Sequence, residues 1–104
     1  MTEQVDAGQL ARLFGALGSG ARIRILQELG EKPLCVGALA MRLEMTQSAI
    51  SQHLTVLRNA GLVESDKRGS FVHYALTEDA RERCGTALDA VVRRRDDEEG
   101  DDDG

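Results

Sequence analysis

The sequence has no apolar run that approaches the roughly 18 residues needed to cross a bilayer. Its first six residues are acidic and polar, unlike a secretory signal, so we expect a cytoplasmic protein. Cysteine is also scarce, and in the cytoplasm Cys35 and Cys84 are expected to be thiols and not a structural disulfide. With 104 residues, 41% of them hydrophobic and 30% charged, the chain is expected to form one globular domain with a modest core.

The sequence also lacks the residue patterns on which enzyme sites are commonly built. It has no phosphate-binding glycine loop, no paired carboxylates on a rigid element and no Cys–His arrangement with an orienting group. Gly15, Gly18 and Gly20 do not follow a strand-like segment, and so they form no dinucleotide-binding fingerprint. We therefore expect that the chain is not an enzyme.

The excess of acidic residues is concentrated at the end of the sequence. The net charge is −5, but residues 96–104 hold seven acidic residues and no basic one. The remaining 95 residues carry 13 basic and 11 acidic residues, a net charge of +2. Because a block of like charges repels itself and stays unfolded, we expect a folded domain over residues 1–95 and a disordered acidic tail over residues 96–104.

Apolar periodicity predicts three helices in the first part of the sequence. The first carries an apolar stripe at the spacing i, i+3, i+4, i+7, formed by Leu10, Leu13, Phe14 and Leu17. Residues 18–20 interrupt this pattern before a second helix over residues 21–29, which Gly30 ends. After Pro33, the only proline, the same spacing predicts a short third helix through Val36, Leu39, Ala40 and Leu43.

A fourth helix, from Gln47 to Ala60, has well-marked ends. Thr46 is a suitable N-cap, because its hydroxyl can accept a hydrogen bond from an unpaired backbone N–H. Gly61 can adopt the left-handed conformation that ends many helices. Leu57 and Leu62 are then spaced as the apolar contact of a Schellman cap.

The rest of the sequence predicts a hairpin and a fifth helix. Two strand-like runs, residues 62–66 and 71–76, flank a turn signal at residues 67–70. Thr77 is predicted to cap the fifth helix, whose apolar stripe is formed by Ala80, Cys84, Ala87, Leu88 and Val91 and which ends at residues 93–95. The expected fold is mainly α (α+β): five helices with a β-hairpin after the fourth, the arrangement of a winged helix-turn-helix.

The predicted fourth helix has two faces of opposite character. At 100° per residue, Ile50, Leu54 and Leu57 cluster on one side. The other side has no acidic residue and carries the short hydrogen-bonding side chains of Ser48, Ser51, Gln52, Thr55 and Asn59. Such a face fits the floor of the DNA major groove, where these side chains can pair with base edges. The alternative interpretation is a neutral polar surface helix.

Basic residues beside this face predict contacts with the DNA backbone. Lys67 and Arg68 on the hairpin turn can contact phosphate or a neighbouring minor groove, which adds affinity and not sequence preference. The complete set of predicted DNA contacts is Gln47, Ser48, Ser51, Gln52, Thr55, Arg58, Lys67 and Arg68. His73 is expected to be a half-buried strand residue. The acidic tail is interpreted as solubilising, with competition against DNA for the basic surface as the alternative.

Three segments of the sequence resemble the ArsR/SmtB family of bacterial repressors. They are residues 34–40 (LCVGALA), 43–54 (LEMTQSAISQHL) and 56–63 (VLRNAGLV), within a similarity that extends from Leu10 to Leu88. Residues 17–25 depart from the family form, which has Asp-Pro-Thr before Arg22. The resemblance implies an inducer-released repressor that binds a two-fold symmetric double-stranded DNA operator as a homodimer.

The resemblance also implies that the first and fifth helices form the dimer interface. The residues expected there are Leu10, Leu13, Leu17, Cys84, Leu88 and Val91. Their apolar stripes agree with this expectation, because a small domain cannot fully bury two such stripes alone. The alternative to a repressor is a winged-helix protein-interaction module without DNA binding, which the acidic net charge favours.

The sequence leaves the inducer open. One family metal site uses Cys-Val-Cys at the third helix, where this chain has Cys35, Val36 and Gly37. The other uses Asp and His residues on the fifth helix, which in this chain has no His. We therefore expect no metal site and no cofactor, and the alternative is a soft thiophilic ion at Cys35, for which the sequence offers no full ligand set. Cys35 and Cys84 are candidate thiol sensors, and packing residues in the alternative interpretation. An oxidant or a small molecule also remains open as the inducer.

Overall fold

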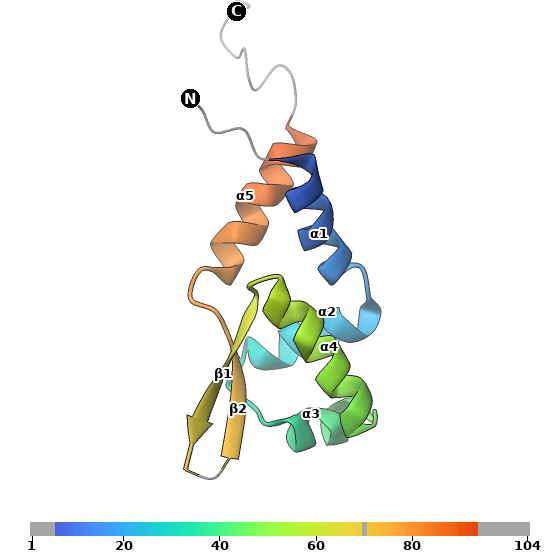
Figure 1. Cartoon of the computed structure of the whole chain (residues 1–104), viewed down its shortest axis with the longest axis vertical. Helices are drawn as coiled ribbons and strands as arrows, with labels where there is room; N and C mark the ends of the chain where they lie inside the picture. The colour runs from blue at the N-terminus through green and yellow to red at the C-terminus, as the bar shows by residue number, and fades with distance from the viewer. Residues whose placement is uncertain (1–5, 70, 94–104) are drawn as a thin grey trace, which may run out of the picture.

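A computed structural model describes residues 6–69 and 71–93 as five helices and one β-hairpin (Figure 1). In chain order the elements are α1 (Ala7–Leu17), α2 (Gly20–Leu29), α3 (Val36–Leu43), α4 (Gln47–Asn59), β1 (Val63–Arg68), β2 (Phe71–Leu76) and α5 (Ala80–Val92). Figure 1 shows α1 and α5 at one end of the molecule and the hairpin and α3 at the other. The predicted order of elements is confirmed, and none of the helices described is long and apolar enough to span a membrane.

Side-chain caps fix where the first two helices begin. Asp6 Oδ1 accepts a hydrogen bond of 3.1 Å from the Gly8 N–H and so caps α1. Ser19 Oγ accepts one of 3.2 Å from the Arg22 N–H. Because Ser19 supplies this cap, α2 begins at Gly20, one residue earlier than the apolar pattern predicts.

The predicted start and both predicted caps of α4 are confirmed, and the helix ends at Asn59, one residue before the predicted end. Thr46 Oγ1 accepts a hydrogen bond of 3.0 Å from the Ala49 N–H. At the other end Gly61 has φ of 79°, and its N–H donates to the Arg58 carbonyl at 2.9 Å. The Leu62 N–H donates to the Leu57 carbonyl at 3.0 Å, which completes a Schellman cap.

The hairpin is longer than the sequence pattern predicts. Its antiparallel register runs from Val63 opposite Leu76 to Arg68 opposite Phe71, which leaves only two residues for the loop. The prediction that Lys67 and Arg68 lie on the turn is therefore wrong, because both belong to β1. Two-residue loops match the twist of paired strands, and Gly69 provides the positive φ, 64°, that such loops require.

The start of α5 also differs from the prediction. Thr77 does not cap the helix, because its hydroxyl donates a hydrogen bond of 2.9 Å to the Gly61 carbonyl. Glu78 and Asp79 form a turn outside the helix, and α5 begins at Ala80 with Asp79 as its N-cap residue. Thr77 therefore joins the end of β2 to the end of α4.

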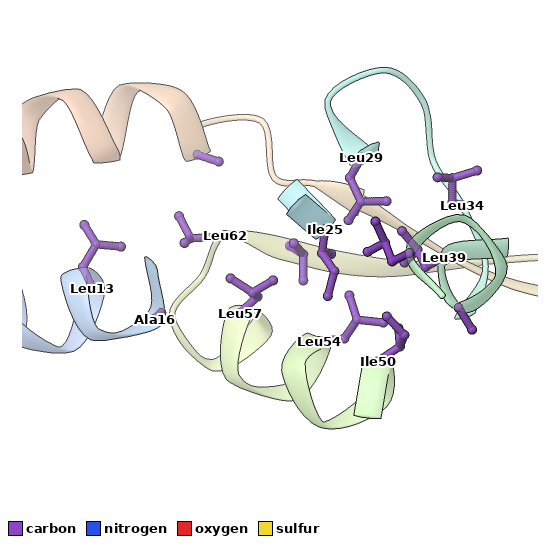
Figure 2. Packing of buried hydrophobic residues seen from close by; sticks show 14 of the residues in the cluster. Leu13, Ala16, Ile25, Leu29, Leu34, Leu39, Ile50, Leu54, Leu57 and Leu62 are labelled. Carbon is purple, nitrogen blue, oxygen red and sulfur yellow. The ribbon is translucent and has the colours of Figure 1, made fainter. Parts of the chain in front are cut away.

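The core lies between α2, α3, α4 and the start of the hairpin (Figure 2). Its fully buried side chains are Ile25, Leu39, Ile50, Leu54, Leu57, Leu62 and Val63. The outer helices contribute less: α1 buries Leu13 and Ala16, and α5 buries only Ala80 and Ala87. The helix-turn-helix is thus the best-packed part of the described chain.

The buried position of Ile50 predicts a large loss of stability on truncation. Ile50 is 0% exposed, so Ile50→Ala should lower the free energy of unfolding by about 2–5 kcal/mol through lost burial and a residual cavity. Met41 is 77% exposed, and Met41→Ala should change the free energy of unfolding by less than about 0.5 kcal/mol. Urea unfolding followed by circular dichroism measures both, and equal effects would contradict this description of the core.

Candidate nucleic-acid interface

The turn between α3 and α4 is tight and begins with an unusual backbone conformation. Glu44 has φ of 56°, in the left-handed region that few residues other than glycine adopt. The Met45 N–H then donates to the Ala40 carbonyl at 3.0 Å. Only Met45 and Thr46 separate this turn from α4, and the first residues of α4, Gln47 and Ser48, are exposed.

We call Ser48, Ser51, Gln52 and Thr55 the polar face of α4. All four residues are exposed, whereas Ile50, Leu54 and Leu57 on the opposite side are buried in the core. The Thr55 hydroxyl donates to the Ser51 carbonyl at 3.0 Å, which leaves its oxygen free to accept. The polar face therefore presents hydrogen-bond donors and acceptors to solvent from a helix whose orientation the core fixes.

The charges on and near α4 suit a polyanionic partner. Helix α4 contains no acidic residue, and Arg58 near its end is exposed. On β1, Lys67 is exposed and shares its side of the hairpin with Val63 and Ser65, because side chains alternate along a strand. The acidic residues of this strand, Glu64 and Asp66, lie on the other side. Arg68 pairs with Phe71 through its backbone, and its side chain lies outside the described part of the chain.

The two histidines occupy different environments. His53, on α4, is half-buried, and its Nδ1 lies 3.2 Å from Nη1 of Arg22. A guanidinium can only donate, so Nδ1 is the acceptor. The same Arg22 donates to the carbonyls of Ala16 at 2.7 Å and Gly15 at 3.2 Å, and it thereby links the end of α1 to α4. His73 on β2 is half-buried, as expected.

The two cysteines lie on different elements and are both half-buried free thiols. Cys35 is the N-cap residue of α3, although its side chain makes no capping hydrogen bond. Cys84 lies on α5 and packs against the core cluster. Figure 1 shows α3 and α5 in different parts of the molecule. Among residues 6–69 and 71–93, no group of three or more His, Cys, Asp or Glu residues could hold a metal ion.

The predicted dimer-interface residues differ in exposure. Leu13 is only 8% exposed and belongs to the core of its own chain, while Leu10, Leu17 and Cys84 are half-buried against that core. Leu88 and Val91 on α5 are 52% and 54% exposed. Val92, which the apolar stripe did not include, is 60% exposed.

Three features of the site have no clear signal in the sequence. Leu34 forms an isolated bridge with Tyr74, with hydrogen bonds of 3.0 and 2.8 Å, which ties the connection before α3 to the hairpin. Arg22 and Arg83 bind backbone carbonyls at helix ends. Arginines in amphipathic helices are ordinarily solvent-exposed, and periodicity does not indicate which of them reach a carbonyl.

A helix-turn-helix with an exposed second helix, followed by a two-stranded hairpin, defines the winged helix-turn-helix class of domain. The family model described as "Bacterial regulatory protein, arsR family" matches residues 19–65, which include all of α2, α3 and α4. This match, together with 34% identity to an ArsR-like regulator over 80% of that regulator's chain, shows that the chain belongs to the ArsR family.

The relatives are similar in sequence and in structure. The HTH-type transcriptional regulator NmtR of Mycobacterium tuberculosis is 44% identical over 70 residues, a match that covers 67% of this chain and 58% of NmtR. An ArsR-like transcriptional regulator from Rhodococcus sp. RHA1 has a TM-score of 0.74 at 34% identity and covers 82% of this chain and 80% of its own. The homodimeric winged helix-turn-helix DNA-binding domain of a possible ArsR-family regulator from Mycobacterium bovis has a TM-score of 0.70 at 28% identity, and the match covers 91% and 93% of the two chains.

The polar face and Lys67 predict different losses on substitution. Gln52→Ala should lower the preference for specific DNA by about 1–3 kcal/mol, because a paired base contact is lost. Lys67→Ala should weaken specific and random DNA alike and make the slope of log affinity against log salt shallower by about one unit. Fluorescence anisotropy titrations at several salt concentrations measure both quantities. Arg81→Ala, at an exposed position in the first turn of α5, is the charge control. If Lys67→Ala changed only the sequence preference, the assignment of Lys67 to a phosphate contact would be wrong.

Proposed function

We propose that the protein is a DNA-binding transcriptional repressor that binds a two-fold symmetric operator as a homodimer and leaves it when an inducer binds. The observation that carries this proposal is the polar face of α4, which is exposed, free of carboxylates and presented by a helix whose other side is buried. The chain spans only 58% of NmtR, but the matched part contains the DNA-reading helix of the proposal.

The DNA contacts fall into two groups with different roles. The polar face, with Gln47 beside it, pairs with base edges in the major groove and determines the preferred sequence. Arg58, Lys67 and Arg68 bind phosphates and supply affinity that depends on salt but not on sequence. Such a regulator acts in the cytoplasm. The acidic segment predicted as a tail, residues 96–104, lies outside the described residues, and we propose for it only a solubilising role.

An apolar strip on α5 supports the homodimer. Leu88, Val91 and Val92 follow each other at the spacing i, i+3, i+4 and are all more than half exposed. An exposed strip of this kind on one helix face favours association with another apolar surface. The related domain from Mycobacterium bovis is described as homodimeric, which agrees with a second copy as that partner.

Light scattering tests the dimer. The wild-type chain should have about twice the mass of 11.3 kDa at micromolar concentration. Leu88→Asp should give the monomer mass, because burying an unpaired charge in an apolar interface is costly. Met41→Asp places the same charge on the exposed surface of α3 and should leave the dimer intact. A stable wild-type monomer would count against the proposed function as a whole.

A protein-interaction module without DNA binding is the second candidate, and the net charge of −5 favours it. A gel-shift titration against salt separates the two candidates. Contacts with DNA phosphates make affinity fall steeply as salt rises, whereas a module of the second kind retards no duplex at any salt concentration. The family consists of regulators, and we propose no enzymatic activity.

The inducer proposed here acts on Cys35 as a soft thiophile or an oxidant. Cys35 is half-buried at the start of α3, the helix that precedes the polar face, so its modification would alter the packing of the helix-turn-helix. An inducer releases DNA only through unequal affinity for the free and DNA-bound conformations, and the coupling is typically about 1–3 kcal/mol.

The thiol hypothesis predicts a selective response in operator binding. Zinc in modest excess should leave the affinity unchanged, while arsenite or a mild thiol oxidant should lower it by about 5- to 150-fold. Cys35→Ser should abolish the response, and Cys84→Ser shows whether the second thiol takes part. If Cys35→Ser responds to these reagents as the wild type does, the inducer is a small molecule that binds elsewhere, with the space between α1 and α5 as the next candidate.

A further inference from the structure

The end of α4 is bonded to α5 by one arginine. Arg83 Nη1 donates to the Gly61 carbonyl at 2.7 Å, and Nη2 donates to the Ala60 carbonyl at 3.0 Å. Carbonyls at a helix end lack partners within the helix, and a cation there also interacts favourably with the helix dipole. Arg83 therefore supplements the backbone Schellman cap of α4 from a separate helix.

Gly61 gives the guanidinium the space it needs. A Cβ at this position would overlap Nη1 of Arg83, and the φ of 79° would be strained for any side chain. The Gly61 carbonyl also accepts the hydrogen bond from the Thr77 hydroxyl, at 2.9 Å. Thr77, directly after β2, and Arg83, near the start of α5, thus both donate a hydrogen bond to the Gly61 carbonyl at the end of α4.

Apolar packing does little to fix α5 against the rest of the chain. Helix α5 fully buries only two alanines, Ala80 and Ala87, and packs the half-buried Cys84 against the core. A cavity of about 390 Å³ opens between α1 and α5, and a second of about 330 Å³ opens between α1 and the end of α4. Arg83 lines both cavities. With so little apolar packing, the directional hydrogen bonds of the exposed Arg83 contribute to the position of α5 relative to α4.

We propose that Arg83 is a positioning residue for operator binding. By bonding α5 to α4, Arg83 sets the spacing between the two polar faces of the dimer. The inference rests on the proposed function, in which α5 joins the two copies and α4 enters the major groove. Two half-sites on one side of the duplex are one helical turn apart, about 34–36 Å. Each polar face reaches its half-site only if α4 keeps a fixed position relative to α5, and Arg83 is the side chain that bonds the two.

A spacer series tests this role. An operator duplex is first obtained by selection from random sequence. Its affinity is then compared with that of duplexes one base pair longer or shorter between the half-sites, and with that of a single half-site. One base pair moves a half-site by about 3.4 Å and about 35°, so the wild type should bind the altered duplexes about tenfold more weakly. Arg83→Gln should bind the optimal duplex about tenfold more weakly than the wild type and lose its spacer preference, because α5 is no longer bonded to α4.

Three comparisons distinguish positioning from a general structural role. Half-site affinity and the dimer mass of Arg83→Gln should equal those of the wild type. Arg83→Lys, which keeps the charge and one hydrogen bond, should recover part of the spacer preference. Arg81→Gln removes the same charge from an exposed position on the same helix and should bind as the wild type does.

The possible results separate this inference from the proposed function. A wild-type spacer preference in Arg83→Gln would overturn the positioning role while leaving the repressor intact. An equal loss of half-site and full-site affinity would also overturn it, since Arg83 would then support α4 itself. Absence of sequence-specific binding by the wild type would instead overturn the proposed function.

Discussion

Burial of the apolar side of α4 is the interaction on which the rest of the structure depends. Ile50, Leu54 and Leu57 are at most 2% exposed and pack in the core formed with α2, α3 and the start of β1. Because a helix has only one rotational setting that buries these three positions, the side chains opposite them must face solvent. The polar face is therefore a consequence of core packing, and its orientation is as rigid as the core.

Helix α4 is bonded to both outer helices through arginines. At its centre His53 is bonded to Arg22, which also holds the end of α1, and at its end Arg83 holds the Gly61 and Ala60 carbonyls. The outer helices bury few side chains of their own, and the most exposed apolar side chains of α5 lie on its last turns. In the proposed repressor these outer helices form the dimer interface, and Arg22 and Arg83 connect that interface to α4, the DNA-reading helix.

Elements with strong local signals could be predicted from the sequence, and those decided by distant contacts could not. Thr46 and Gly61 define α4 because both caps involve residues within a few positions along the chain. Thr77 has the same apparent capping signal, yet its hydroxyl bonds to Gly61, a partner 16 positions away. The bridge between Leu34 and Tyr74 and the bonds of Arg83 likewise join segments distant in sequence.

The candidate site divides in the same way. Amphipathic periodicity alone places Ser48, Ser51, Gln52 and Thr55 on the exposed side of α4, because burial of the opposite side follows from residue type. The extent of the hairpin was not predictable, since strand pairing continues until the loop geometry stops it, and Lys67 therefore lies on β1. Leu13 fits an interface stripe by spacing but is buried within its own chain.

The most direct test of the central claim, that the polar face of α4 reads DNA bases, is selection of bound duplexes from a fully randomised pool. We expect enrichment of a two-fold symmetric sequence whose half-sites are centred about 10 base pairs apart. Retention of the duplexes with no enrichment of any sequence would contradict it, because binding would then come from phosphate contacts alone.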